Sequence, residues 1–271
     1  MMKKSSVSLA VILLLVMSVL AACGGAKQSG SAGGGDGSLD RVKKAGVLKV
    51  AIDASYPPME FVDKDGKTYI GFDVDYATEL AKKLGVKAQF ENVAWDGILT
   101  GLKAGKYDVI MSSMNITEER LKEVNFVEYA QMAQNFVSRK GFDVKTEKDL
   151  AGKIVAVQAE TTSHMWADEQ KAKGIAIKEI NSFPGATDAF LALKNERADV
   201  VVIDEPVARY YAKLDGHKVT GQAMGAEPVG IAIRKEDVDL MKALEQAVKD
   251  TKADGTFKKL SEKWFGSELG K

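Results

Sequence analysis

Two stretches of the chain share one pattern, and each ends in a polar side chain suited to ligand binding. LKAGKYDVIMSS runs from Leu102 to Ser113, and LKNERADVVVID runs from Leu193 to Asp204. In both, an amphipathic helix is followed by an Asp, an apolar run and then the polar residue. The carboxyl ends of buried parallel strands border the crevice where α/β sheets bind ligands. The half-repeat therefore predicts two similar lobes, with Ser113 and Asp204 on opposite walls of a cleft.

Motifs for covalent or metal chemistry are missing from the sequence. It has no H-E-x-x-H, G-x-S-x-G, C-x-x-C or P-loop pattern, and its two histidines are His164 and His217. His164 lies in a predicted helix and His217 in a turn, so we assign neither a role. We expect no catalytic residue, no metal and no cofactor.

Strands and helices alternate around the first half-repeat. Apolar patterns predict strands at 47–53, 87–92 and 108–112 and helices at 39–44, 73–84 and 96–103. Ser38 is expected to cap the first of these helices and Thr117 a further one. Asp65-Gly66 predicts a hairpin within 61–72. The alternation indicates βαβ units and hence an α/β fold.

The second half-repeat lies in a segment that interrupts the first lobe. Residues 133–139 and 229–234 read as β, and between them come a strand at 153–158, a helix at 162–172 and the half-repeat itself. We therefore place lobe 1 at 38–133 and 229–271 and lobe 2 at 134–228, each with a mixed, mostly parallel sheet flanked by helices. Two crossings between lobes make a hinge that permits closure.

The N-terminus is typical of an export signal. Two lysines precede an apolar run at 9–22, which is too short for a comfortable membrane span of about 20 residues. Its end, Leu20 to Cys23, resembles the lipobox of bacterial lipoproteins. Residues 1–23 are therefore expected to be a signal peptide that leaves Cys23 lipidated, with ordinary cleavage or an uncleaved anchor as alternatives. Residues 24–37, rich in Gly, Ser and Ala, predict a flexible tether.

Composition restricts the partners and the sources of stability. The chain has 38 basic and 38 acidic residues, scattered along helix faces, so the basic patch of a nucleic-acid binder is missing. Cys23 is the only cysteine, which excludes an intrachain disulfide.

Four motifs give the sequence a specific resemblance. AIDASYPPMEF, GFDVDYATELAKKLG, SSMNITEER and VVIDEP resemble the polar amino-acid receptors of bacterial ABC importers, the family 3 solute-binding proteins, over nearly all of residues 46–265. The resemblance implies a type II periplasmic-binding-protein fold and no enzymatic activity. It implies an extracytoplasmic, lipid-anchored monomer that binds a free L-amino acid and presents it to the membrane permease, either at the outer face of the plasma membrane or in a periplasm.

The resemblance also assigns the ends of the amino acid. Arg120 matches the arginine that grips the α-carboxylate, for which a guanidinium offers a planar fork. Ser113, Asn115 and, from the second lobe, Thr162 match residues that complete this carboxylate site. Asn115 departs from the usual Ser or Thr, which leaves its side-chain contact open. Asp204 matches the carboxylate that holds the ammonium group.

The ligand side chain is assigned in the same way. Asp53, Tyr56 and Trp95 match the side-chain pocket, and Gln158 matches a position that varies with the side chain recognised. Glu160 replaces the usual Gly. A further acid near Asp53 favours a ligand with positive charge, with a Glu160 that points to solvent as the alternative.

Each assignment has a plainer alternative. Arg120 could be a solvent-facing partner of Glu119 or Glu123, and Asp204 could cap the next helix. Tyr56 and Trp95 could be core residues. Some proteins resembling this family dehydrate prephenate-like acids with a carboxylic acid in the cleft, so a prephenate or arogenate dehydratase-like enzyme using Glu160 is the alternative function.

Overall fold

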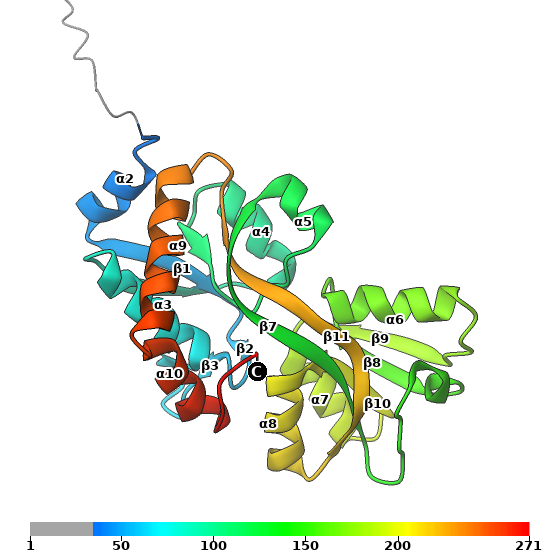
Figure 1. Ribbon diagram of the computed structural model, residues 1–271. Coiled ribbons are helices and arrows are strands. Elements are labelled where there is room, and N and C mark those ends of the chain that lie inside the picture. Colours follow the sequence, from blue (N-terminus) through cyan, green and yellow to red (C-terminus); the bar gives the residue numbers. More distant parts are fainter. Residues whose placement is uncertain (1–34, 271) are drawn as a thin grey trace, which may run out of the picture. The chain divides into compact units, whose positions relative to one another are not determined.

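An eight-stranded mixed sheet organises the computed structural model, which describes residues 35–270 (Figure 1). The strand order is β5-β1-β6-β11-β7-β10-β8-β9. On one side, β5 (Lys87–Asn92), β1 (Val47–Ile52) and β6 (Val109–Ile110) are parallel; on the other, β10 (Val200–Asp204), β8 (Ile154–Gln158) and β9 (Glu179–Phe183) are parallel. Between them, β7 (Asn125–Ser138) and β11 (Lys218–Ile233) run antiparallel and belong to both halves.

Helices flank both halves of this sheet, as the α/β prediction requires. The first half carries α2 (Ser38–Ala45), α3 (Phe72–Lys83), α4 (Trp95–Lys103), α5 (Glu118–Glu123), α9 (Val238–Ala253) and α10 (Thr256–Phe265). The second half carries the short 3-10 helix η1 (Glu147–Leu150), α6 (Thr162–Ala172), α7 (Ala186–Lys194) and α8 (Glu205–Asp215). The expected hairpin is present in a small sheet of β2 (Ser55–Tyr56), β3 (Glu60–Val62) and β4 (Tyr69–Ile70). The two-lobed α/β fold is confirmed, whereas the lobe boundaries at 133/134 and 228/229 stay a prediction.

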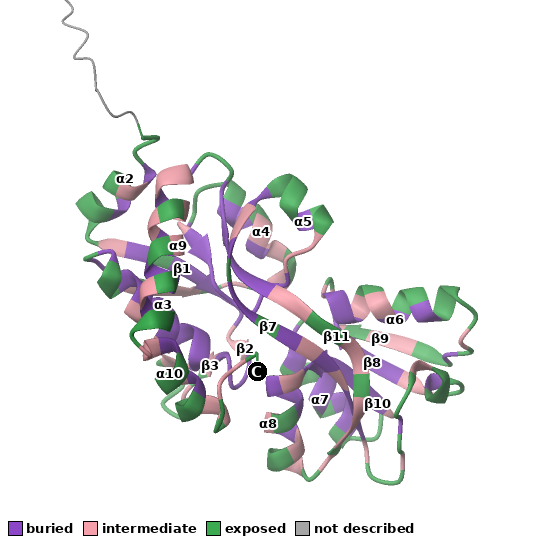
Figure 2. Cartoon of the chain, viewed as in Figure 1, coloured by how far each residue is buried: buried purple, intermediate pink, exposed green. Residues whose placement is uncertain are grey.

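Strands β8 and β10 are almost wholly buried, β7 and β11 are partly exposed, and the outer faces of the helices are exposed (Figure 2). All five residues of β10 are buried. This burial follows from its apolar VVVI run, which is typical of a parallel strand covered by helices on both sides. The same run brings Asp204 to the end of a dry strand.

Three local expectations were wrong. Strand β6 spans two residues rather than 108–112, because the chain turns at Ser113, which has φ 52°. Strands β7 and β11 begin well before 133 and 229. Ser38 is the first residue of α2 rather than its cap, and its hydroxyl instead accepts a hydrogen bond from Leu240 N of α9 at 3.0 Å. Polar and glycine residues interrupt the β pattern of β7 and β11, so their full length was not predicted. The hydrogen bond of Ser38 is to a residue distant in sequence, which local patterns do not indicate.

The predicted export signal and Cys23 lie outside the described residues, as does most of the predicted tether. Within residues 35–270, none of the helices has the length and apolar character needed to cross a membrane.

Gly71 sets the start of α3 and so the place of Asp73. Its φ is 137°, and a Cβ there would stand 2.1 Å from the Met59 carbonyl oxygen. The turn is closed by hydrogen bonds from Phe72 N to Pro58 O, 3.0 Å, and from Asp73 N to Met59 O, 2.9 Å. Only a residue without a side chain fits this close approach.

We therefore expect Gly71→Ala to lower the free energy of unfolding by at least about 2 kcal/mol, through backbone strain and the clash. Gly66→Ala is the control, because Gly66 also has a positive φ of 70° but nothing within 4 Å of its Cβ position. It should lose about 1 kcal/mol. Urea denaturation measures both, and equal losses would contradict this account of Gly71.

Candidate functional site

A small cavity lies where the strand ends of the two halves of the sheet meet. The space among its lining atoms, including the part open to solvent, is about 330 Å³. Eight of the nine predicted ligand-binding residues line it: Asp53, Tyr56, Trp95, Ser113, Asn115, Gln158, Thr162 and Asp204. The two ends of the half-repeat, Ser113 and Asp204, are thus brought to one cavity.

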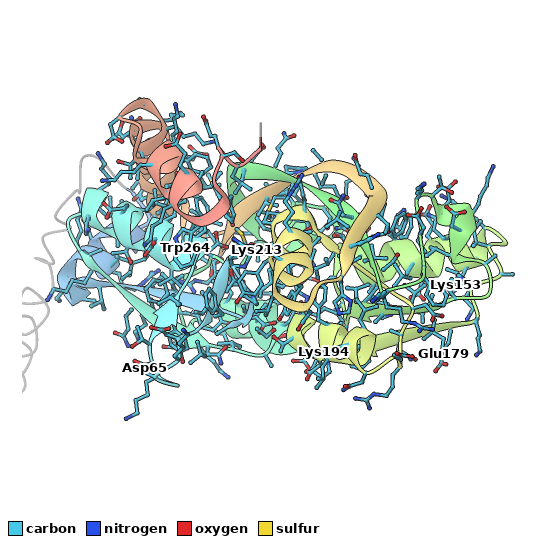
Figure 3. The ribbon with its side chains drawn as sticks, turned by 90° about the horizontal axis from the view of Figure 1, so that it is seen from below. Asp65, Lys153, Glu179, Lys194, Lys213 and Trp264 are labelled. Carbon is cyan, nitrogen blue, oxygen red and sulfur yellow. The ribbon has the colours of Figure 1, made fainter. Side chains whose placement is uncertain are left out.

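A larger hollow of about 1550 Å³ lies between α8 and α10, where Lys213 and Trp264 are found (Figure 3). Some of the charged side chains that line it are paired at the surface, such as Arg209 with Glu205 at 2.5 Å. The small cavity instead combines enclosure with several convergent polar groups, as binding sites for small molecules do. It is the better candidate.

Arg120 lies against the cavity without lining it. Its side chain is buried, and it donates hydrogen bonds to Asn115 O at 2.9 Å and to Glu160 O at 3.2 Å. Its guanidinium carbon is 5.4 Å from the centre of the Trp95 ring, a cation–π distance. Burial lowers the pKa of Arg120 to about 10, so it stays charged at neutral pH. Arg120 is not a solvent-facing partner of Glu119, which pairs with Lys122.

Asp204 is a buried acid with half of its hydrogen-bonding capacity unused. Tyr56 donates its hydroxyl to Asp204 Oδ2 at 2.8 Å, while Oδ1 is buried and has no partner among residues 35–270. Although Asp204 precedes α8, its side chain makes no capping hydrogen bond, so the capping alternative is wrong. Burial raises its pKa to about 7. A buried acceptor without a partner at a cavity wall suits an ammonium group.

Asp53 and Gln158 meet across the cavity. Gln158 Nε2 donates to Asp53 Oδ2 at 2.6 Å and to Pro184 O at 3.1 Å. Burial raises the pKa of Asp53 above its ordinary value. Since Asp53 follows β1 and Gln158 ends β8, this contact joins the two halves of the sheet.

Ser113 is held by an acid that sequence reasoning missed. Its N–H and hydroxyl both donate to Asp73 Oδ2, at 2.8 and 3.1 Å. Asp73 also accepts from the Tyr129 hydroxyl at 2.8 Å, and burial raises its pKa to about 6. The donors expected to bind a ligand carboxylate are thus engaged by Asp73. The role of Ser113 in ligand binding stays a prediction.

Glu60 is a second missed acid, and it lines the cavity. Ser112 donates its hydroxyl to Glu60 Oε1 at 2.6 Å and accepts from Asp53 N at 3.0 Å. Burial, together with the charge of Asp73, raises the pKa of Glu60 well above its ordinary value. Glu60 lies next to apolar residues in AIDASYPPMEF, and Asp73 does so in GFDVDYATELAKKLG. An acid among apolar residues was the feature of the sequence that could have indicated them.

Polar side chains from β7 and α6 complete the wall. Gln134 Nε2 donates to Thr162 Oγ1 at 2.5 Å, and Ser163 Oγ donates to Gln134 Oε1 at 2.6 Å. Thr162 in turn donates to Asn115 Oδ1 at 3.1 Å. Gln134 and Ser163 were not predicted, because a polar residue inside a long strand or a first helical turn carries no pattern of its own.

Glu160 takes part through its backbone. Its φ is 59°, a conformation that favours glycine, and its carbonyl accepts from Arg120 and from Trp95 Nε1 at 3.2 and 3.3 Å. The residue is exposed and is not among those that line the cavity. No group of three or more His, Cys, Asp or Glu suited to a metal ion occurs within residues 35–270.

The raised pKa of Asp204 predicts how the stability of the protein depends on pH. Its pKa rises from 3.8 unfolded to about 7 folded, so ionisation weakens the fold. The stability that the folded state keeps while Asp204 is protonated is fully present below pH 4 and is lost as the pH rises through 7. Asp204→Asn should therefore raise the free energy of unfolding of the ligand-free protein by about 1 to 3 kcal/mol at pH 8, with a smaller gain near pH 4.

Urea denaturation at both pH values measures this effect, with Asp143→Asn at an exposed position as the control. A loss of stability in Asp204→Asn at pH 8 would show that the ionised carboxylate is well solvated or paired.

Comparison with known proteins identifies the family of the chain. The family model of bacterial extracellular solute-binding proteins, family 3, matches residues 48–267. The L-cystine-binding protein TcyJ of Escherichia coli K12 is 35% identical over 241 residues, which cover 87% of this chain and 89% of TcyJ.

Solved structures are similar over comparable lengths. A mutant of ArgBP from T. maritima is 40% identical, with a TM-score of 0.78 over 85% of this chain and all of the other. The ancestral amino acid-binding protein AncCDT-1, a precursor of cyclohexadienyl dehydratase, is 44% identical, with a TM-score of 0.76 over 84% and 99% of the two chains. The chain therefore belongs to the bacterial extracellular solute-binding proteins of family 3.

Proposed function

We propose that this protein binds one free polar L-amino acid in the small cavity and delivers it to the permease of an ABC importer. The observation that carries the proposal is Asp204 Oδ1, a buried acceptor without a partner within residues 35–270, together with the buried guanidinium of Arg120 that contacts Asn115 of the cavity wall. An amino acid supplies an ammonium for the first and a carboxylate for the second. Three or four charge-assisted hydrogen bonds of about 1.5 to 3 kcal/mol each support micromolar affinity, after the cost of ordering.

The balance of charge favours a basic side chain on the amino acid. Within residues 35–270, four buried carboxyl groups lie in or beside the cavity, those of Asp53, Glu60, Asp73 and Asp204, and burial raises the pKa of each; the buried guanidinium beside them is that of Arg120. A ligand with an extra cation favours the ionised forms of these carboxyl groups. Among the relatives, ArgBP has an arginine-bound form, which supports a basic amino acid. TcyJ is named for L-cystine, which supports one without a basic side chain.

The remaining parts of the proposal concern delivery. Cys23 anchors the protein by a lipid outside the cytoplasm, and residues 24–37 tether the binding lobes. Lobe 1, at 38–133 and 229–271, and lobe 2, at 134–228, close about β7 and β11, and the closed monomer is what the permease recognises. Support for this part comes from the sequence and from the family.

A dehydratase activity is not favoured by the site. The acid considered for it, Glu160, is exposed and does not line the cavity, and its backbone rather than its carboxyl group contacts Arg120. A prephenate-like acid incubated for hours with substoichiometric protein should be recovered intact, whereas a radiolabelled amino acid should be retained stoichiometrically.

Arg120→Ala should weaken binding of every amino acid by about 100-fold or more, because two charge-assisted hydrogen bonds to the common α-carboxylate are lost. Arg120→Lys keeps the charge but loses the fork and should also bind weakly. Lys122→Ala, on the exposed side of the same helix, is the control. Thermal shift against the twenty amino acids, followed by calorimetry, measures this, and unchanged affinity in Arg120→Ala would reject the assignment.

Gln158→Ala should instead change the order of preference among amino acids. It removes the hydrogen bond that engages Asp53 and leaves that carboxylate free for a cationic side chain. The affinity ratio of basic to neutral amino acids should change by about 10-fold or more. Ser182→Ala, at an exposed position of β9, should keep the original order. An unaltered order in Gln158→Ala would remove Gln158 from the specificity-determining residues.

A further inference from the structure

Glu227 lies in an irregular stretch of β11 and faces the carboxylate end of the cavity from outside. The register of β11 against β7 shifts between Met224 and Glu227, and such bulges re-aim the side chains beside them. The next residue, Pro228, accepts a hydrogen bond from Ile116 N at 2.8 Å. The backbone thus ties the Glu227 segment to the segment that carries Asn115.

The carboxylate of Glu227 is part of a network that reaches the cavity. Glu227 Oε2 accepts hydrogen bonds from Asn115 Nδ2 and from Gln134 Nε2, each at 3.3 Å. Asn115 and Gln134 both contact Thr162, and all three line the cavity. Of these four side chains, Glu227 alone carries a charge. It uses amide donors that a ligand carboxylate beside Arg120 would also use.

We propose that Glu227 is a proton-linked positioning residue, which orients Asn115 and Gln134 and takes up a proton when an amino acid binds. This inference rests on the proposed function, because it requires a ligand carboxylate beside Arg120. The ligand carboxylate and the Glu227 carboxylate then share one set of donors and one nearby cation. Two carboxylates in such a position do not both remain ionised without a large electrostatic penalty.

Charged groups around Glu227 set the direction of the effect. Arg120 on α5 attracts its negative charge, Asp204 at the end of β10 repels it, and Glu169 on α6 lines the same outer hollow. Burial already raises the pKa of Glu227, while Thr162 and Arg120 lower it. A ligand carboxylate neutralises Arg120 and adds a like charge, so both changes raise the pKa of Glu227 further.

The proton can arrive without opening the cavity. Glu227 lines a hollow of about 610 Å³ on the outer surface, together with Met165, Trp166, Glu169 and Met224. Thr162 lines both this hollow and the cavity, so the two adjoin at this side chain. Glu227 therefore connects solvent to the ligand's carboxylate end.

Calorimetric titration with L-arginine, L-histidine and L-cystine tests this, in buffers of different ionisation enthalpy at pH 5, 6, 7 and 8. The enthalpy differences give the protons exchanged on binding. Wild-type protein should take up more protons than Glu227→Gln, which preserves the acceptor for Asn115 without the charge. Glu227→Gln should bind about 3- to 10-fold more tightly at pH 8, an advantage that disappears at pH 5.

Two variants control for position and folding. Glu169→Gln, in the same outer hollow but at an exposed residue paired with Lys173, should exchange protons as the wild type does. Glu227→Asp, which keeps the charge, should retain proton uptake, and it tests the inference if Glu227→Gln does not fold. Equal proton exchange in the wild type and Glu227→Gln at every pH would overturn the inference. Wild-type protein that binds none of the three amino acids would reject the proposed function itself.

Discussion

Asp204 ends an apolar strand with one carboxylate oxygen hydrogen-bonded to Tyr56 and the other without a partner among residues 35–270. Burying a carboxylate in this way is unfavourable unless a cation reaches it. Among residues 35–270, the buried cation beside the site is Arg120, and two of its donors point to the Asn115 and Glu160 carbonyls. Other acids around the cavity are buried as well, which deepens the deficit of positive charge. Without a ligand, the buried carboxyl groups of the site therefore have too little positive charge beside them. A zwitterion with an additional cation supplies that charge.

Other contacts in the fold hold the polar groups of the site in position. Gly71 lets the chain enter α3 so that Asp73 reaches Ser113, and Asp73 holds Ser113 at its positive φ. Gln158 brings Asp53 into contact with the other half of the sheet. Each of these contacts fixes a polar group whose burial would be unfavourable without a hydrogen-bond partner. This is the pattern expected when residues are selected for binding rather than for stability of the empty protein.

Patterns local in sequence were predictable, and contacts between distant segments were not. The half-repeat predicted the shared cavity of Ser113 and Asp204, and apolar periodicity placed β5 and α3 within a residue. Family resemblance, rather than periodicity, drew attention to Arg120. Glu60 and Asp73 were missed because their partners, Ser112 and Ser113, lie 40 or more residues away in the sequence. Gln134 and Glu227 were missed because their contacts depend on how β7 and β11 pair. Strands β7 and β11 were shortened in prediction because glycine and amide residues interrupt the β pattern there.

The central claim is that one ligand meets a positive group at one end and a negative group at the other. The most direct measurement compares the affinity of the tightest-binding amino acid with that of its methyl ester and of its desamino analogue. Each analogue removes one pole and leaves the side chain intact. We expect both to bind at least about 100-fold more weakly, in line with the loss of one or two charge-assisted hydrogen bonds. An analogue that binds as tightly as the parent amino acid would contradict the account.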